Sequence, residues 1–266
     1  MGTVSTCIVP RMGLSMATAE RWVRRWEAQQ ERYALDREER FTVIADVVEQ
    51  ATAHVRRPRV ADLGCGPGSL AARLARRLPH AAVTAADVDA LLLELGRTHH
   101  ADAARFVHAE IGADGWLRQL DLDGPLDAAV STTALHCLDA AALRRTYEGL
   151  ADVLRPGGVL VNSDGNDAAN GDGAGPVARL AREVGRRRAA RQGPAGREDW
   201  DTWWRAAAED PELAALLPAP APARTPGLRH NGLGPDAHTA LLREAGFADV
   251  APVWQFGDDY VLVAVR

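Results

Sequence analysis

The sequence predicts an α/β fold built on a mostly parallel sheet, and three observations support this. Residues 60–78 read as a short apolar strand, a glycine-rich turn and an amphipathic helix. Further short apolar runs end in polar residues and are followed by helical patterns. The chain closes on two apolar runs joined by a short turn, as in a β-hairpin. Strands that alternate with helices are typical of sheets covered by helices.

Each element follows from its local pattern. A helix is expected from Thr18, with Thr18 as its N-cap, and another over residues 37–54. Asp89 is expected to cap a helix after the second strand, and Asp236 a helix near the end. Arg155-Pro156-Gly157-Gly158 stops a helix over residues 143–154 and turns the chain into the next strand. The expected strands are residues 60–63, 81–87, 105–109, 126–131, 159–161, 247–256 and 259–265.

Composition limits the partners. The 266 residues carry a net charge of −5, so no general attraction to nucleic acid or anionic lipid is expected. No apolar run approaches the ~18 residues that a membrane span needs. All 31 basic residues are arginine, which excludes a phosphate-binding lysine or a Schiff-base lysine.

Three separated cysteines indicate neither a disulfide framework nor a zinc site. Cys7, Cys65 and Cys137 form no C-x-x-C pair, so we expect no metal and a reducing, cytoplasmic location. Cys137 is expected to be a small buried apolar residue. Residues 1–16 are expected to be a disordered leader, and residues 17–266 a single domain whose residues 17–55 form an N-terminal helical cap.

The glycine turn V-A-D-L-G-C-G-P-G-S, residues 60–69, is the most informative stretch. Glycine is needed where the backbone takes a positive φ or where a ligand approaches the main chain. A dinucleotide-binding turn has its third glycine three residues after the second, but Ser69 stands there. The spacing found is G-x-G-x-G, with Asp62 two positions ahead. An NAD-dependent oxidoreductase is therefore disfavoured.

The D-x-G-x-G-x-G pattern resembles motif I of the class I S-adenosylmethionine-dependent methyltransferases. The later L-R-P-G-G-V-L-V stretch and the terminal helix-and-hairpin are similar to the same family. The resemblance implies a Rossmann-like, seven-stranded, mostly parallel sheet with an antiparallel last strand, helices on both faces and a helical cap. It also implies S-adenosylmethionine as cofactor, with S-adenosylhomocysteine as product.

The expected cofactor contacts lie at the strand ends. An acidic residue roughly 20 residues after the glycines, here Asp87, is placed to accept hydrogen bonds from the ribose hydroxyls. The resemblance implies that Asp62 faces the charged methionine part and that Glu110 and Ile111 meet the adenine. It also implies that a tyrosine or arginine between the first two helices, where Tyr33 and Arg37 stand, reaches the carboxylate, and Tyr33 is the residue chosen. The expected cofactor-binding set is Tyr33, Asp62, Gly64, Gly66, Gly68, Asp87, Val88, Glu110, Ile111, Ser131 and Thr132.

The expected acceptor contacts are fewer. His136 follows the fourth strand and is the first choice of general base, with Asp164 and His230 behind it. Residues 165–233 are read as a lid inserted between strands five and six. Trp203 and Trp204 in it either wall the acceptor pocket or pack the lid on the core. The expected catalytic residues are thus His136 and Asp164, and the substrate-binding residues are His136, Asp164, Trp203, Trp204 and His230.

The function implied is an in-line transfer of a methyl group to a small-molecule acceptor. A methyltransferase fold with a non-methylating role, such as catalysis of a cyclisation or rearrangement, stays open as the alternative, because a fold does not fix the chemistry. A nucleic-acid methyltransferase is disfavoured by the charge and by S-T-T-A after the fourth strand. The oligomeric state, monomer or homodimer, stays open.

Overall fold

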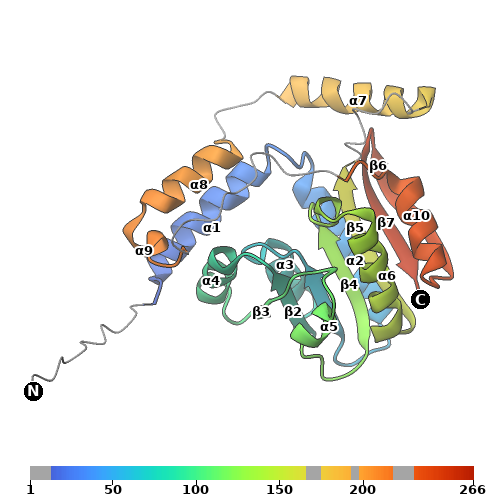
Figure 1. Ribbon diagram of the computed structural model, residues 1–266, viewed down its shortest axis with the longest axis horizontal. Coiled ribbons are helices and arrows are strands. Elements are labelled where there is room, and N and C mark those ends of the chain that lie inside the picture. Colours follow the sequence, from blue (N-terminus) through green and yellow to red (C-terminus); the bar gives the residue numbers. More distant parts are fainter. Residues whose placement is uncertain (1–12, 166–174, 193–197, 218–230) are drawn as a thin grey trace, which may run out of the picture.

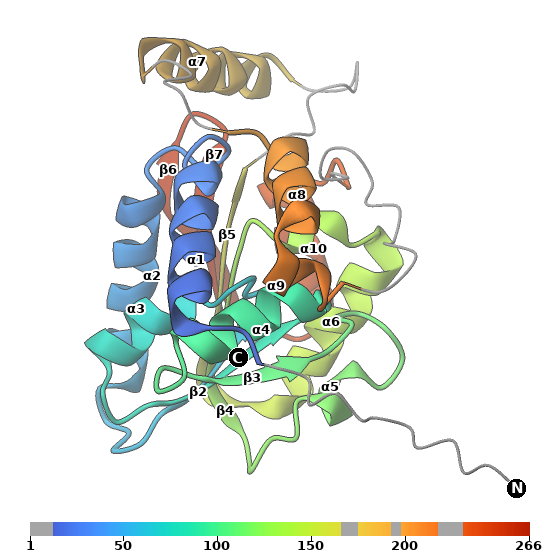
Figure 2. The ribbon, with the colours of Figure 1, turned by 90° about the vertical axis from the view of Figure 1, so that its left-hand side faces the viewer.

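The fold is a seven-stranded sheet in the order β3-β2-β1-β4-β5-β7-β6 (Figures 1 and 2). The computed structural model describes residues 13–165, 175–192, 198–217 and 231–266. β7 alone runs antiparallel to its neighbours β5 and β6. The strands are β1 (Arg59–Leu63), β2 (Ala82–Asp87), β3 (Arg105–His108), β4 (Leu126–Thr132), β5 (Leu154–Gly165), β6 (Asp249–Phe256) and β7 (Asp259–Val265). The fold class predicted from the sequence is confirmed.

Helices cover both faces of the sheet because its inner strands are apolar on both sides. In β1, Val60 packs with one face and Ala61 and Leu63 with the other. One face carries α2 (Arg37–Thr52), α3 (Ser69–Arg77) and α4 (Ala90–His99). The other carries α5 (Trp116–Gln119), α6 (Ala140–Val153) and α10 (Pro235–Glu244). Trp116 is a core residue there, 3% exposed.

The strand order reverses between β1 and β4, which are adjacent and parallel. Such a switch point leaves a crevice at the carboxyl ends of the strands, because the helices that follow them diverge to opposite faces. The glycine turn after β1 and the segment after β4 lie beside this crevice.

α1 (Met16–Gln30), α8 (Trp200–Glu209) and α9 (Pro211–Ala214) form a cap over this end of the sheet. Trp22 and Trp203 meet edge to face at 5.2 Å in its core. Arg21 pairs with Asp210 at 2.7 Å, and the Thr18 hydroxyl donates to Glu212 at 2.7 Å. Figure 1 shows α1 and α8 side by side. Of the two helices in residues 17–55, α1 thus packs with α8 and α9, whereas α2 packs on the sheet.

α7 (Pro176–Gln192) lies apart from the cap, against the β6–β7 turn (Figure 1). Gly185 lies so close to Asp258 that an added Cβ would come within 2.4 Å of its carboxylate. Arg188 pairs with Asp36 and stacks on the Phe256 ring at 3.9 Å. The described parts of residues 165–233, which were predicted to form one lid, thus pack in two different places.

Several predicted boundaries differ from the structure. α1 begins at Met16, because the Ser15 hydroxyl accepts from the Thr18 amide, so Thr18 is not the cap. α10 begins at Pro235 after Gly234, not at Asp236. Residues 162–165, which lie beyond the expected strand over 159–161, extend β5, because β7 supplies pairing partners up to Asp259. None of the helices in the described part of the chain has the length and apolarity needed to cross a membrane.

Candidate functional site

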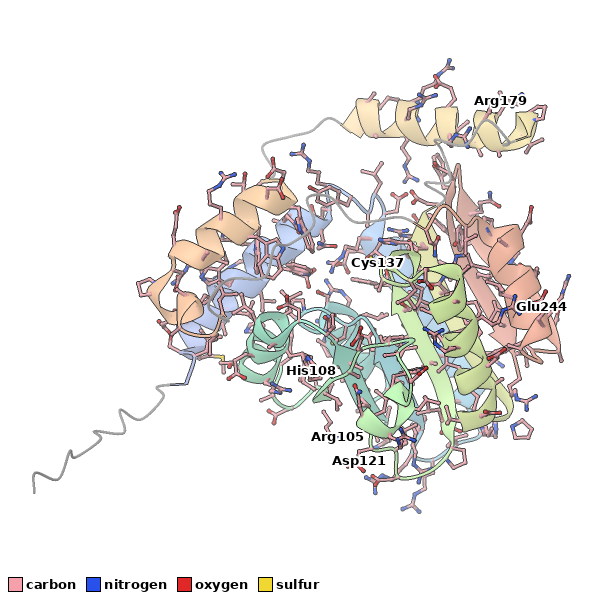
Figure 3. All side chains as sticks on the ribbon, viewed as in Figure 1. Arg105, His108, Asp121, Cys137, Arg179 and Glu244 are labelled. Carbon is pink, nitrogen blue, oxygen red and sulfur yellow. The ribbon has the colours of Figure 1, made fainter. Side chains whose placement is uncertain are left out.

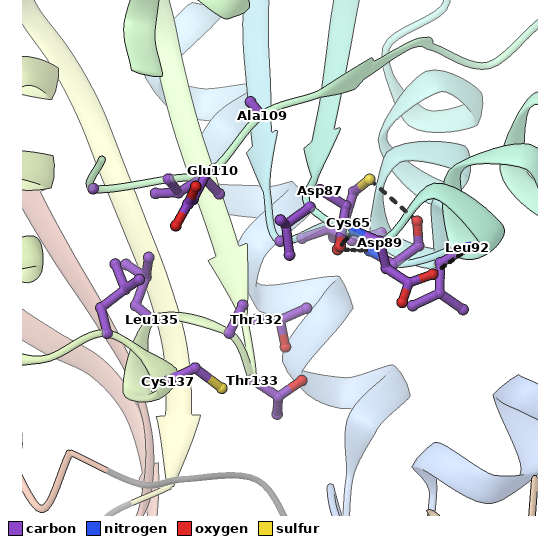
Figure 4. Close-up of a pocket in the computed structure, with 18 of the residues that line it drawn as sticks. Cys65, Asp87, Asp89, Leu92, Ala109, Glu110, Thr132, Thr133, Leu135 and Cys137 are labelled. Atoms are coloured by element: carbon purple, nitrogen blue, oxygen red, sulfur yellow. Dashed lines mark hydrogen bonds between the residues drawn. The ribbon is translucent and has the colours of Figure 1, made fainter. Parts of the chain in front are cut away.

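A cavity of about 650 Å³ lies between the cap and the carboxyl ends of β1, β2, β3 and β4 (Figure 4). This volume falls within the range of small-molecule sites. The sheet contributes lining residues from the glycine turn (Gly64, Cys65 and Gly66) and from the ends of the next three strands (residues 87–89, 109–113 and 132–135). The helices contribute Trp26, Gln30, Arg37, Ser69, Leu70, Arg145, Trp200 and Trp204.

The glycine turn forms the floor of the cavity. Gly64, Gly66 and Gly68 have φ values of 72°, 54° and 88°, which side chains rarely tolerate. A Cβ on Gly64 would stand 2.3 Å from the Cβ of Ala134, and one on Gly66 would stand 3.4 Å from the Trp26 ring. Glycine therefore allows the turn to fit between the segment after β4 and the cap, with its backbone open to a ligand.

Asp87 is fixed at the end of β2 by two backbone hydrogen bonds. One carboxylate oxygen accepts from the Gly66 amide and the other from the Asp89 amide, each at 2.8 Å. Burial raises its pKa. Each carboxylate oxygen keeps a second lone pair, so the side chain still has capacity for two hydroxyl donors. Asp89 caps α4 by accepting from Leu91 and Leu92, as predicted.

Asp62 lies behind the glycine turn and does not line the cavity. One of its oxygens accepts from the Ala71 amide at 3.0 Å, and the other is buried without a hydrogen-bond partner. Burial raises the pKa of Asp62 to about 7, and the nearby Asp87 charge adds to the rise. An unsatisfied buried carboxylate oxygen costs stability, so its presence favours a positively charged ligand group close to the turn.

We expect Asp62→Asn to change how stability depends on pH. Between pH 3.8 and about 7 the folded protein holds on Asp62 a proton that the unfolded chain has released. The free energy of unfolding should therefore fall as the pH rises through this window. In the Asp62→Asn variant it should fall less steeply, because asparagine does not titrate. Urea unfolding of both proteins at pH 5 and 8 measures this difference. Parallel pH curves for the two proteins would contradict it.

The other expected cofactor residues divide into two groups. The first group lines the cavity and consists of Val88, Glu110, Ile111 and Thr132. Ser131 is fully buried, and its hydroxyl donates to the Leu63 carbonyl at 2.8 Å. Because adjacent residues of a strand point to opposite faces, only one of Ser131 and Thr132 reaches the cavity.

Tyr33 does not line the cavity, whereas Arg37 does. The Tyr33 hydroxyl accepts from the Trp200 amide at 2.9 Å and so joins the end of α1 to the start of α8. Arg37 is 8% exposed, pairs with Glu27, and stacks on the Phe41 ring at 4.6 Å. Of these two residues, only Arg37 is therefore placed to contact a ligand in the cavity.

His136 and Asp164 are brought together, but away from the cavity lining. His136 Nδ1 lies 2.7 Å from Asp164 Oδ1, and the two side chains are 5% and 1% exposed. Burial lowers the pKa of His136, but its hydrogen bond with Asp164, and then that with Cys137, raise it to about 10. The prediction of His136 as general base therefore gains no support from the position of its side chain, and it stays a prediction.

Of the two tryptophans predicted to bind the substrate, only one lines the cavity. Trp204 and its helix neighbour Trp200 line the cavity. Trp203 is fully buried between Trp22 and Trp26, so it packs the cap and does not reach a ligand. His230 lies outside the described residues.

Several lining residues were not singled out from the sequence. Cys137 was expected to be buried but is exposed and lines the cavity. Figure 3 places it at the cap end of the sheet. Trp26 also lines the cavity, and a Cβ added to Gly66 would lie 3.4 Å from its ring. The position of Trp26 depends on the packing of α1 against the glycine turn. Nothing in the local sequence predicts that packing. Among the described residues, no group of three metal-ligating side chains gathers.

The fold and the cavity define an α/β domain with a cavity of ligand-binding size at the switch point of a mostly parallel sheet. Residues 60–158 match the family model described as a methyltransferase domain. An "Uncharacterized methyltransferase" of Mycobacterium tuberculosis is 43% identical over 102 residues, covering 38% of this chain and 47% of that protein. A trans-aconitate 2-methyltransferase of Streptomyces coelicolor is 34% identical over 181 residues, covering 68% of this chain and 55% of that protein.

Structural similarity extends over nearly the whole chain. A TehB-like methyltransferase from Corynebacterium glutamicum superposes with a TM-score of 0.51 at 15% identity, covering 95% of this chain and all of that one. The chain spans about half the length of the two curated relatives. The chain thus carries a class I S-adenosylmethionine-dependent methyltransferase domain, with its family signature over residues 60–158.

Proposed function

We propose that the protein transfers a methyl group from S-adenosylmethionine to a small-molecule acceptor. The observation that carries this proposal is Asp87, held by two backbone amides at the end of β2 and beside a glycine floor. This arrangement suits a ribose diol. The absence of a third glycine at Ser69 favours S-adenosylmethionine over a dinucleotide.

The residues present fit this cofactor. The glycine floor gives the room that a Cβ would fill, and Asp87 offers acceptors for the ribose hydroxyls. Val88 and Ile111 would contact the adenine, with Glu110 at its edge. Bound S-adenosylmethionine supplies an electrophilic methyl group on a sulfonium.

The opposite end of the cavity suits the amino-acid part of the cofactor. Arg37 and the start of α3, at Ser69 and Leu70, would hold a carboxylate, because a guanidinium and a helix N-terminus both attract anions. The unpartnered oxygen of Asp62 lies behind the same turn and favours the cofactor's positive charge. The chain's main contribution to the reaction is then alignment, which is worth about 7–11 kcal/mol in favourable cases.

A small acceptor is favoured by the enclosure of the cavity. About 650 Å³ must hold the cofactor and the reacting part of the acceptor, and Trp26, Trp200 and Trp204 close it from the cap. The Streptomyces coelicolor relative is by its name a methyltransferase of trans-aconitate, which is a small molecule. No observation favours the alternative, non-methylating role.

Calorimetric titration with S-adenosylmethionine, S-adenosylhomocysteine and NAD tests the proposal. We expect micromolar binding of the first two and no heat from NAD, because Ser69 stands where a dinucleotide-binding turn has its third glycine. Incubation with a mixed acceptor library should then release S-adenosylhomocysteine above the level without acceptor. Binding of NAD alone, or no binding of any of the three, would contradict the proposed function.

A further inference from the structure

Thr133, directly after β4, has a backbone conformation that a threonine rarely adopts. Its φ is 50°, in the left-handed region, where a β-branched residue is an outlier. The other described non-glycine residues with a positive φ are Asp36 and Asp121, whose residue type tolerates this region better. The Thr133 amide is fixed, because it donates to the Ser163 carbonyl at 2.9 Å. Strain of this kind is concentrated in binding and catalytic sites.

The positive φ breaks the alternation of side chains at the end of β4. Adjacent residues of a regular strand point to opposite faces, so Thr132 and Thr133 would not both reach the cavity. Both line it here, and Figure 4 shows both side chains beside the end of β4. Within the described part of the chain, neither hydroxyl makes a hydrogen bond. The Thr133 hydroxyl can therefore donate one hydrogen bond to a ligand and accept two.

The cap side of the same cavity is an aromatic wall, made of Trp26, Trp200 and Trp204. The three rings meet one another edge to face, with centroids 5.5 to 6.3 Å apart. Such a wall favours a flat apolar group, because aromatic rings pack on one another in offset or edge-to-face contacts. The part of the cavity that the proposed cofactor contacts do not use thus offers aromatic rings and a neutral hydroxyl.

The charges of the lining disfavour an anionic acceptor. Only two of the lining residues are cations, and both are engaged. Arg37 pairs with Glu27, and Arg145 donates to the Gly112 carbonyl at 2.8 Å. Four lining residues are acidic, namely Asp87, Asp89, Glu110 and Asp139. A carboxylate held only by neutral hydroxyls in such surroundings would lose more hydration than it regains.

We propose that Thr133 binds the acceptor, and that the acceptor is an uncharged flat molecule that bears a hydroxyl group. This inference rests on the proposed function and names the acceptor class. The Thr133 hydroxyl forms a hydrogen bond with the acceptor's hydroxyl, while the acceptor's ring packs on the aromatic wall. The hydrogen bond orients the acceptor oxygen, and alignment of the reacting atoms is what such a site supplies. Glycine would adopt this φ without strain, so threonine is retained here at a cost in stability.

Urea unfolding of Thr133→Gly tests the strain without any ligand. The substitution keeps the backbone conformation and removes the strained side chain. We expect an unfolding midpoint equal to or above that of the wild type, because relief of strain offsets the added freedom of the unfolded chain. Thr84→Gly, in the regular part of β2, is the control and should lower the midpoint. Equal losses in the two variants would show that Thr133 is not strained.

Calorimetric titration of the S-adenosylhomocysteine complex with 2-naphthol, a neutral flat hydroxyl compound, tests the binding role. Thr133→Val keeps the shape of the side chain and loses the hydroxyl, so 2-naphthol should bind about five- to tenfold more weakly. Thr133→Ser should restore the affinity, and both variants should bind S-adenosylhomocysteine like the wild type. 2-Naphthoate, which carries a carboxylate in place of the hydroxyl, should bind the wild type more weakly than 2-naphthol.

Asp121→Gly is the matched control for a change at a positive φ. Asp121 has a φ of 45°, and Figure 3 shows it at the end of the sheet opposite to Cys137. This variant should bind 2-naphthol like the wild type.

Two results would overturn the proposal. No binding of 2-naphthol, or tighter binding of 2-naphthoate, would refute the acceptor class. Equal affinity of the wild type and Thr133→Val for 2-naphthol would refute the role of Thr133. The same titrations on the protein without S-adenosylhomocysteine separate this inference from the proposed function. A protein that binds 2-naphthol through Thr133 but binds no S-adenosylhomocysteine would refute the methyl transfer and leave the hydroxyl-binding site intact.

Discussion

Gly64→Ala should abolish cofactor binding and lower the free energy of unfolding by about 3 kcal/mol. The substituted residue would keep a φ of 72°, which costs an L-residue ~1–2 kcal/mol. Its Cβ would also stand 2.3 Å from the Cβ of Ala134, and such overpacking costs ~1–3 kcal/mol. Relief of the contact must move either the floor of the cavity or the segment after β4. Urea unfolding and titration with S-adenosylhomocysteine measure the two effects.

Gly232→Ala is the matched control for this prediction. Gly232 has nearly the same φ, 73°, but no atom lies within 4 Å of its added Cβ. The control should therefore lose only the ~1–2 kcal/mol of backbone strain and bind S-adenosylhomocysteine like the wild type. Equal destabilisation of the two variants would show that the contact with Ala134 has no role in the turn.

Asp87→Ala should weaken S-adenosylhomocysteine binding by about 3 kcal/mol or more, which is over 100-fold. Two hydrogen bonds from the ribose to a charged acceptor are lost, each worth ~1.5–3 kcal/mol. The Gly66 and Asp89 amides also lose their acceptor, so the glycine floor is no longer held to the end of β2. Calorimetric titration gives the affinity directly.

Two further variants distinguish the loss of the ribose hydrogen bonds from the loss of a negative charge and from a loss of stability. Asp87→Asn keeps one side-chain oxygen and should lie between the wild type and Asp87→Ala. Asp199→Asn removes the same charge but keeps an N-cap at the start of α8. It should bind like the wild type. An Asp87→Ala protein that folds and binds within threefold of the wild type would contradict the assignment of the ribose site.

Local patterns were sufficient for the parts of the fold held by near neighbours. The turn after β1 and the N-cap of α4 depend on residues within a few positions, so Gly64, Gly66 and Asp89 could be predicted. The antiparallel β7 followed from the terminal hairpin and the family resemblance. The end of β5 could not be predicted, because residues 162–165 are polar and become strand through pairing with β4 and with Asp259–Leu262, nearly 100 residues later.

The sequence by itself determined the α/β fold, the glycine floor of the cavity and Asp87 at the end of β2, since each rests on short-range backbone requirements. Only the tertiary structure decided which neighbouring side chain faces the cavity. Trp204 lines it but Trp203 does not, and Cys137 lines it but His136 does not. The physical reason is that successive side chains of a helix or tight turn point in different directions. Which direction meets the ligand depends on packing against α1, β5 and α10, which lie far away along the chain.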